Sequence, residues 1–390
     1  MERTIDECFF QIQNGANIKQ GDVDGGYPIT RIETTANDKF NRDRMGYAGI
    51  TDLSKYESYV LEDGDLLMSH INSVQYLGRT VLYEKQGGES IIHGMNLLRL
   101  KARRDIINPA YARYCFYGHL FRSQVANITK KSVNQASFAV KDLKQIKIDV
   151  PEVERQNQIV EILNKTNELI EKRQQELDTL DELIKARFVE MFGDPADSSN
   201  MNSVELSEIC KKITDGEHGS VARVPNGHPF LNAKHIMKNG RIDWDTITFI
   251  GDEDHQRIYR RCNPEEGDIL LTTTGTIGNV AIMPKHEEVS MDRGITLLKI
   301  DRQRVTSEFV AEMLKQPAVQ TEMGANVHAS AIGHLFMNKV KKLPAIVPSM
   351  DEQVEFTDFV KQVDKSKVAV EKALDETQTL FDSLMQEYFG

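Results

Sequence analysis

Two stretches of the chain place side chains that can read DNA bases in turns behind apolar runs. The run EDGDLLMSH (62–70) is followed by Asn72, Ser73, Gln75 and Tyr76. The run EEGDILLTT (265–273) ends in Thr273 and is followed by Thr274 and Thr276. Asn and Gln can pair bidentately with adenine, and a threonine can meet the methyl group of thymine. We therefore predict that these turns contact DNA bases.

A second pair of stretches has side chains suited to the DNA backbone. It comprises Lys130, Lys131, Asn134 and Gln135, with their rough counterparts Asn326, His328 and Ser330. Each stretch precedes the strand that leads into a long helix. Lysines in such a stretch would bind phosphates and fix the register of the protein on the duplex. For any one of these residues, a solvated loop remains the alternative interpretation.

Motifs that resemble catalytic signatures have better structural interpretations. NPAY (108–111) is one residue away from the NPPY signature of methyltransferases, but no glycine-rich cofactor loop follows a strand upstream, and Asn-Pro is a common helix start. TTTGTIG (272–278) lacks the GK[ST] ending of a phosphate loop and is typical of a turn between strands. The ten histidines are scattered, without metal-ligand spacing. We expect no catalytic residue, no metal and no cofactor in this chain.

The composition is that of a globular chain with two or three domains. It has 390 residues, 40% of them hydrophobic and 27% charged. Its apolar runs are far shorter than the roughly 18 residues that a membrane span needs, and MERTIDECFF is not typical of a signal peptide. The four widely spaced cysteines indicate neither a disulfide framework nor a zinc site. We expect a cytoplasmic protein with reduced thiols.

The net charge of −11 is unevenly distributed. Residues 151–192 hold ten acidic and six basic side chains, and residues 351–390 hold ten and four, which gives −4 and −6. Residues 97–147 hold eleven Lys or Arg against Asp105 and Asp142, a local charge of +9. Such a stretch fits either a nucleic-acid face or an ordinary solvated surface.

The second half of the chain repeats the first at an offset of about 200 residues. The run 62–70 matches 265–273 at offset 203, MNLLRL (95–100) matches ITLLKI (295–300) at offset 200, and 148–163 matches 345–360 at offset 197. The halves differ most in IKQGDVDG against SVARVPN and in SHINSVQY against TTTGTIGN. We therefore expect them to recognise different sequences.

Each half is predicted to end in a long helix that begins at a proline, Pro151 or Pro348, followed by acidic residues. Each helix carries an apolar seam with alternating steps of four and three residues, as coiled coils do. The first seam comprises Ile159, Leu163, Thr166, Ile170, Arg173, Leu177, Leu180, Ile184, Arg187 and Met191. The second comprises Phe356, Val360, Val363, Lys367, Val370, Leu374, Thr377, Phe381, Leu384 and Tyr388.

These elements predict an α+β fold with two tandem mixed α/β domains, each followed by a long helix, and the two helices packed as an antiparallel coiled coil with pseudo-two-fold symmetry. The predicted order is a first domain at 1–150, a helix at 151–192, a linker at 193–203, a second domain at 204–347 and a helix at 348–390. A helix of about 40 residues is roughly 60 Å long. With one domain at each end, the helices would set the spacing of two half-sites, at most roughly 18 base pairs apart.

The repeated domain and helix, with PEVERQ and PSMDEQ opening the helices and GDILLTTTGTIGNVAI (267–282) in the second domain, resembles the specificity (S) subunit of Type I restriction-modification systems. The first domain departs from the pattern, because its SHINSVQYLGRTVL lacks TGTIG. The resemblance implies two target-recognition domains that read an asymmetric, bipartite double-stranded DNA target. It also implies that two methyltransferase (M) subunits dock on the helices and bind S-adenosylmethionine, with a motor-nuclease (R) subunit as a further partner. The chain itself would be a non-catalytic subunit of an adenine-specific methyltransferase and endonuclease complex.

Two other functions remain open from the sequence. The acidic helices are also compatible with a coiled-coil scaffold whose domains bind protein and not DNA. A tandem enzyme is the other alternative, and the lack of a nucleophile, a base and a cofactor cradle together disfavours it.

Overall fold

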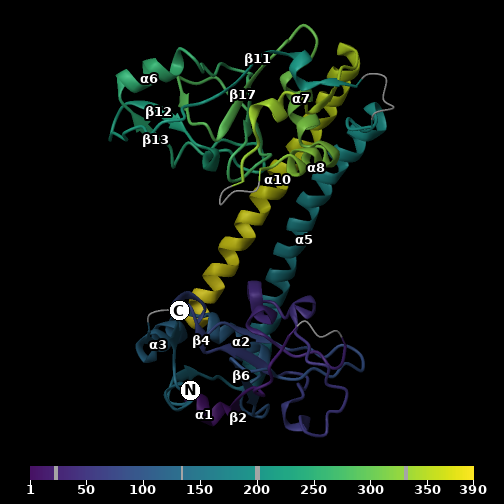
Figure 1. Ribbon diagram of the computed structural model, residues 1–390. Coiled ribbons are helices and arrows are strands. Elements are labelled where there is room, and N and C mark those ends of the chain that lie inside the picture. The colour runs from purple at the N-terminus through teal and green to yellow at the C-terminus, as the bar shows by residue number, and fades with distance from the viewer. Residues whose placement is uncertain (22–24, 133–134, 198–202, 329–332) are drawn as a thin grey trace. The chain divides into compact units, whose positions relative to one another are not determined.

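The computed structural model describes residues 1–21, 25–132, 135–197, 203–328 and 333–390 (Figure 1). They form two compact units. Unit 1 comprises Met1–Gln174 and Lys372–Gly390, and unit 2 comprises Gln175–Glu371. Each unit therefore holds one mixed α/β domain, part of the helix that follows it and part of the other long helix.

The domain of unit 1 is built on an antiparallel sheet of order β2-β6-β3-β5. One of its two inner strands, β3, is the apolar run Leu66–Ser69, which is buried along its whole length. The strands of this domain are β1 (Glu2–Thr4), β2 (Phe9–Asn14), β3, β4 (Ile71–Asn72), β5 (Thr80–Leu82), β6 (Leu97–Ala102), β7 (Lys130–Lys131), β8 (Ala136–Ser137) and β9 (Lys147–Asp149). Its α-helices are α1 (Ile5–Cys8), α2 (Pro109–Tyr117), α3 (His119–Ile128) and α4 (Val140–Leu143).

The domain of unit 2 repeats this plan with a sheet of order β11-β17-β14-β15. A second sheet of order β13-β12-β16 lies in the same domain. The strands are β10 (Ser203–Glu205), β11 (Cys210–Asp215), β12 (His228–Leu231), β13 (Thr248–Ile250), β14 (Ile269–Thr272), β15 (Val280–Ile282), β16 (Ser290–Met291), β17 (Ile295–Ile300) and β18 (Pro344–Ile346). The α-helices are α6 (Asp252–Tyr259), α7 (Ser307–Leu314), α8 (Pro317–Ala325) and α9 (Met337–Val340).

The repeat is confirmed, but one of its blocks is displaced by two residues. Leu66 of β3 pairs with Leu100 of β6, and its counterpart Ile269 of β14 pairs with Leu298 of β17. Strands β6 and β17 therefore correspond at offset 198 and not at the predicted 200. Because side chains alternate between the two faces of a strand, a slip of two residues leaves the apolar pattern unchanged. The pattern alone could not resolve this register.

The NPAY motif is a helix start, as predicted. Asn108 is the N-cap of α2, and its side-chain oxygen accepts a hydrogen bond from the backbone nitrogen of Ala110 at 2.8 Å. Pro109 follows at the first helical position, where a missing N–H costs no hydrogen bond. Thr306 has the same role in front of α7, because its hydroxyl accepts from the backbone nitrogen of Phe309. The NPAY motif therefore caps the start of helix α2.

The two long helices are α5 (Val153–Phe192) and α10 (Met350–Phe389), each beginning two residues after its proline. In unit 1, Ile159 and Leu163 near the start of α5 share one apolar core with Phe389 at the end of α10. In unit 2, Ile184 near the end of α5 shares a core with Phe356 near the start of α10. The helices therefore pack antiparallel within each unit, as the seams predict. No helix among the described residues is long and apolar enough to span a membrane.

Polar members of the seams are paired across the two helices. In unit 1, the guanidinium of Arg173 donates to the backbone oxygen of Ala373. In unit 2, Lys367 forms an ion pair of 2.5 Å with Asp181. These contacts satisfy charged groups at positions where a coiled coil normally buries apolar side chains.

A glutamine behind each helix-opening proline joins the helix to its own domain. The Gln353 side chain is buried, and its Nε2 donates to the backbone oxygens of Arg304 at 2.9 Å and Pro348 at 3.0 Å. Its Oε1 accepts from the backbone nitrogen of Thr306 at 2.9 Å. Gln156 makes the equivalent three bonds in unit 1. The Gln of the two opening motifs therefore fixes the start of the helix against the domain.

Candidate nucleic-acid interface

In unit 1, a small sheet brings together the two stretches that the sequence singles out. Its order is β4-β8-β7. Asn72 in β4 and Lys131 in β7 both lie opposite Ala136 of the middle strand, while Ile71 and Lys130 lie opposite Ser137. The turn predicted to read bases and the lysines predicted to bind phosphates therefore belong to one surface element.

The side chains of this element have different roles. Asn72 shapes its own turn, because its Oδ1 accepts from the backbone nitrogen of Ser73 at 2.8 Å and its Nδ2 donates to Ser69. Gln75 is exposed in the 3-10 turn Val74–Tyr76 that follows. Tyr76 is 36% exposed and lies under the guanidinium of Arg79, 4.6 Å from the ring centre.

The phosphate-binding candidates of unit 1 are partly described. Lys130 and Lys131 are exposed. The backbone oxygen of Gln135 closes the β7–β8 turn by accepting from the backbone nitrogen and the hydroxyl of Ser132, at 2.8 and 2.7 Å. Asn134 lies outside the described residues.

Unit 2 repeats this arrangement with different side chains. Backbone bridges join Thr274 to His334 and His334 to His328. The Thr274 hydroxyl lies 2.7 Å from Nδ1 of His334. Burial, reinforced by the positive charge of Arg293, lowers the pKa of His334, so its ring is neutral near pH 7 and able to accept or donate one hydrogen bond. The equivalent pairings put Thr274 where unit 1 has Ile71, His334 where it has Ser137, and His328 where it has Lys130.

The remaining candidates of unit 2 divide into exposed, structural and undescribed residues. Thr276 is exposed at the tip of the turn after β14. Asn326 ends α8, because its side chain donates to the backbone oxygen of Glu322 at 2.9 Å. Ser330 lies outside the described residues. Phe336, which the sequence argument did not select, is 49% exposed and has its ring centre 4.8 Å from that of His334.

Thr273 does not belong to this surface. Its side chain is 1% exposed, and its hydroxyl lies 3.3 Å from the hydroxyl of Thr296 and 3.4 Å from the backbone oxygen of Gly294. The reason is that pairing with the neighbouring strand segment continues one residue beyond β14, so Thr273 still points into the fold. We correct the expectation that it contacts bases.

The basic stretch 97–147 is not a single surface. Arg99 is 1% exposed and donates to the backbone oxygens of Ser58 and Val60. Other members are paired with acidic neighbours, namely Lys101 with Glu62, Arg104 with Asp63, Lys144 with Asp6 and Lys147 with Glu2. Five of the eleven basic side chains are therefore buried or paired with acidic neighbours, so the charge count overstated the positive surface.

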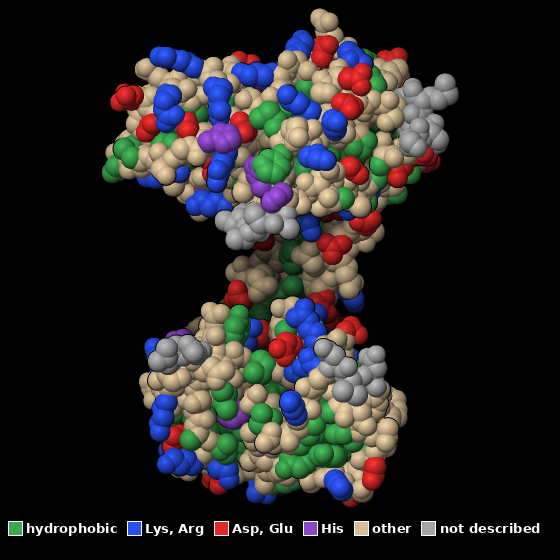
Figure 2. Space-filling view, in the orientation of Figure 1, with side chains coloured by type: hydrophobic (Ala, Val, Ile, Leu, Met, Phe, Trp, Pro, Cys, Tyr) green, Lys and Arg blue, Asp and Glu red, His purple; other side chains and the backbone are tan. Residues whose placement is uncertain are grey.

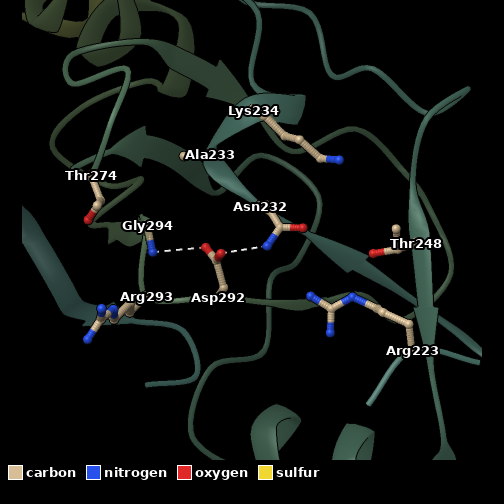
Figure 3. Close-up of a pocket in the computed structure, with 9 residues that line it drawn as sticks. All are labelled: Arg223, Asn232, Ala233, Lys234, Thr248, Thr274, Asp292, Arg293 and Gly294. Atoms are coloured by element: carbon tan, nitrogen blue, oxygen red, sulfur yellow. Dashed lines mark hydrogen bonds between the residues drawn. The ribbon is translucent and has the colours of Figure 1, made fainter. Parts of the chain in front are cut away.

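An open hollow in unit 2 contains polar residues that the sequence argument missed. It has a volume of about 440 Å³ (Figure 3). Its polar lining comprises Arg223, Asn232, Lys234, Thr248, Asp292 and Arg293, and it is bordered by Thr274 of the predicted turn. Lys, Arg and His side chains are also prominent on the face of unit 2 seen in Figure 2. Arg223 falls within SVARVPN, so the divergence between the halves was the signal that could have identified it.

Comparisons with known proteins agree on one family. The family model described as "Type I restriction modification DNA specificity domain" matches residues 2–180 and again residues 198–377. A protein of Methanocaldococcus jannaschii named as the type I restriction enzyme MjaX specificity subunit is 28% identical over 403 residues, covering 97% of this chain and 91% of the relative.

Two solved structures share the fold. The Type I restriction-modification S subunit from M. genitalium aligns with a TM-score of 0.51 at 16% identity, covering 100% of this chain and 96% of that one. A chain from a study of complex assembly and conformational transition of the type I R-M system aligns with a TM-score of 0.57 at 14% identity, covering 100% and 97%. At these identities the likeness concerns the fold alone.

Proposed function

The chain belongs to the family of Type I restriction-modification DNA specificity subunits, and from this premise we propose that it reads an asymmetric, bipartite DNA target, one half-site per domain. The observation that carries the proposal is the equivalent surface element of the two units. It has the same backbone pairing in both, but the paired residues are Ile71, Ser137 and Lys130 in one and Thr274, His334 and His328 in the other. Because base edges are distinguished by the donors and acceptors that face them, such surfaces would select different half-sites.

The proposal assigns no catalytic step to this chain. Specificity subunits are the non-catalytic subunits of type I systems, and we propose that two methyltransferase subunits dock on the long helices. Those partners would bind S-adenosylmethionine and methylate adenine, and a motor-nuclease subunit would join them in the cytoplasm. The helices would set the spacing between the half-sites.

Exposed apolar side chains on both helices support the docking proposal. Leu183 of α5 is 46% exposed and Leu380 of α10, its counterpart at offset 197, is 52% exposed. Leu169 and Val368 are exposed to a similar degree. Equivalent apolar positions left open on both helices are expected if two copies of one partner bind there.

A salt titration of DNA binding tests the proposal. We expect affinity to fall steeply with salt, because lysine–phosphate contacts release counterions. Replacing both Lys130 and Lys131 by alanine should weaken binding to all sequences alike and reduce the salt slope by roughly one per lost phosphate contact. Lys85→Ala, at another exposed lysine of unit 1, is the matched control. Salt-independent binding, or no DNA binding by the complex, would instead support a protein-binding scaffold.

A further inference from the structure

The hollow of unit 2 is lined on one side by a preorganised hydrogen-bond donor. The guanidinium of Arg223 lies over the buried ring of Phe230, 4.3 Å from its centre, and its Nη1 donates to the backbone oxygen of Val221 at 2.8 Å. Its Nε and Nη2 have no hydrogen-bond partner among the described residues. In Figure 3 the guanidinium points into the hollow. A planar pair of N–H donors is therefore held ready for a ligand.

The opposite side of the hollow carries a fixed acceptor. One oxygen of Asp292 accepts from Nδ2 of Asn232 at 2.6 Å, and the other accepts from the backbone nitrogen of Gly294 at 2.9 Å (Figure 3). A carboxylate has about four lone-pair sites, so these bonds orient Asp292 and still leave it able to accept from a ligand. Arg223 and Asp292, both described, form no ion pair with each other, and the space between them remains open.

The donor of Arg223 and the acceptor of Asp292 together distinguish between a phosphate and the different base pairs as ligands of the hollow. A phosphate would meet Arg223 favourably but would be repelled by the carboxylate of Asp292. The major-groove edge of a guanine–cytosine pair presents two acceptors, guanine N7 and O6, beside one donor, cytosine N4. An adenine–thymine pair would instead place the adenine amino donor next to its acceptor N7, which a fork of donors cannot match.

Resting on the proposed function, we propose that the hollow reads a guanine–cytosine pair in the half-site of unit 2. Arg223 donates to guanine N7 and O6, and Asp292 accepts from cytosine N4. Lys234 and Arg293 border the same hollow and would contact the flanking phosphates.

At the equivalent position, unit 1 has a hydrogen-bond donor and no carboxylate acceptor. Strand pairing shows that Asn232 and Asp292 correspond to Arg31 and Gly94. The Nε of Arg31 donates to Oε1 of Gln20 at 2.9 Å. A Cβ at Gly94 would lie 2.1 Å from the backbone oxygen of Thr30, so no carboxylate side chain can be accommodated there. Unit 1 therefore lacks the acceptor that would recognise cytosine in this way.

The test uses the full chain in complex with its methyltransferase subunits. DNA methylated by the wild-type complex and by complexes with Arg223→Lys or Asp292→Asn is sequenced at single-molecule resolution. We expect both variants to lose selectivity at the same guanine–cytosine position of one half-site, by about ten- to a hundredfold, while the other half-site is unchanged. Arg260→Lys, at an exposed arginine of unit 2 outside the hollow, should leave the motif intact.

Base analogues in binding assays with the wild-type complex identify the groups read. At that position 7-deazaguanine, which lacks N7, should weaken binding, whereas hypoxanthine, which lacks only the minor-groove amino group, should not. A motif unchanged in both variants, or weakened binding to all sequences alike, would overturn the inference and leave the proposed function standing. A wild-type complex that methylates without any motif would overturn both.

Discussion

Replacing Gln353 by leucine is expected to lower the free energy of unfolding of unit 2 by about 3 to 5 kcal/mol. Leucine has nearly the same volume, but it removes three hydrogen bonds from a fully buried position and leaves the backbone nitrogen of Thr306 and two carbonyl oxygens without that partner. An unsatisfied buried polar group costs about 1 to 3 kcal/mol.

The effect can be measured by urea unfolding followed through tryptophan fluorescence. The chain has a single tryptophan, Trp244, which packs in unit 2 against His286 with ring centres 3.9 Å apart. Gln362→Leu is the matched control, because Gln362 is exposed on the same helix and its replacement should change stability by less than about 0.5 kcal/mol. Equal shifts for both variants would show that the three bonds of Gln353 do not hold the helix to the domain.

Phe188→Ala is expected to destabilise unit 2 by a similar amount, about 3 to 5 kcal/mol. Phe188 of α5 is fully buried, and its ring centre lies 5.5 Å from that of Phe309 in the domain and 5.4 Å from that of Phe356 in α10. Truncation leaves a cavity where helix α5, helix α10 and the domain meet. Neighbouring apolar groups can relax into such a cavity only in part.

The same fluorescence assay reports this loss, with Val189→Ala as the control. Val189 is the next residue of the same helix and is 48% exposed, so its truncation removes few contacts. If Phe188→Ala unfolds at the same urea concentration as Val189→Ala, then the end of α5 does not stabilise the domain of unit 2.

Phe188 also shows how far the sequence could define the helix packing. The regular steps of the seam predicted Arg187 as an inward position, and Arg187 does face α10, where it is half-buried and pairs with Glu355. The fully buried residue at this end of the helix, however, is its neighbour Phe188. A seam of this period describes one helix packed on another. At its ends α5 also packs on a domain, and this contact has no signature in the helix sequence alone.

The helices and their starts were predictable because local chemistry determines them. Pro151 and Pro348, the acidic residues behind them and the cap at Asn108 all act within one helical turn, and the structure places the helix starts within two residues of the expected positions. The joining of β4 to β8 depends on strand pairing across more than 60 residues. The repeat indicated it indirectly, by marking the same two stretches in both halves.

Individual site residues were harder to predict because exposure depends on long-range packing. Thr273 and Thr274 are adjacent and chemically identical, but one lies inside the sheet and the other borders the hollow. Likewise Arg99 is buried while Lys131 is exposed, although both contribute to the same basic stretch. The hollow combines residues from segments as far apart in the sequence as Arg223 and Arg293. No local sequence pattern predicts that such distant segments come together.

The most direct test of bipartite reading is the methylation pattern of DNA exposed to the complex of this chain with its methyltransferase subunits. We expect adenine methylation at a split, asymmetric motif that disappears without this chain. Replacing Gln75, which is exposed in unit 1, should alter one half of that motif, whereas replacing Thr276, which is exposed in unit 2, should alter the other. If the methyltransferase is shown to be active and to bind this chain, but its methylation pattern stays the same when this chain is removed, the account is contradicted. That result would favour a scaffold function for this chain.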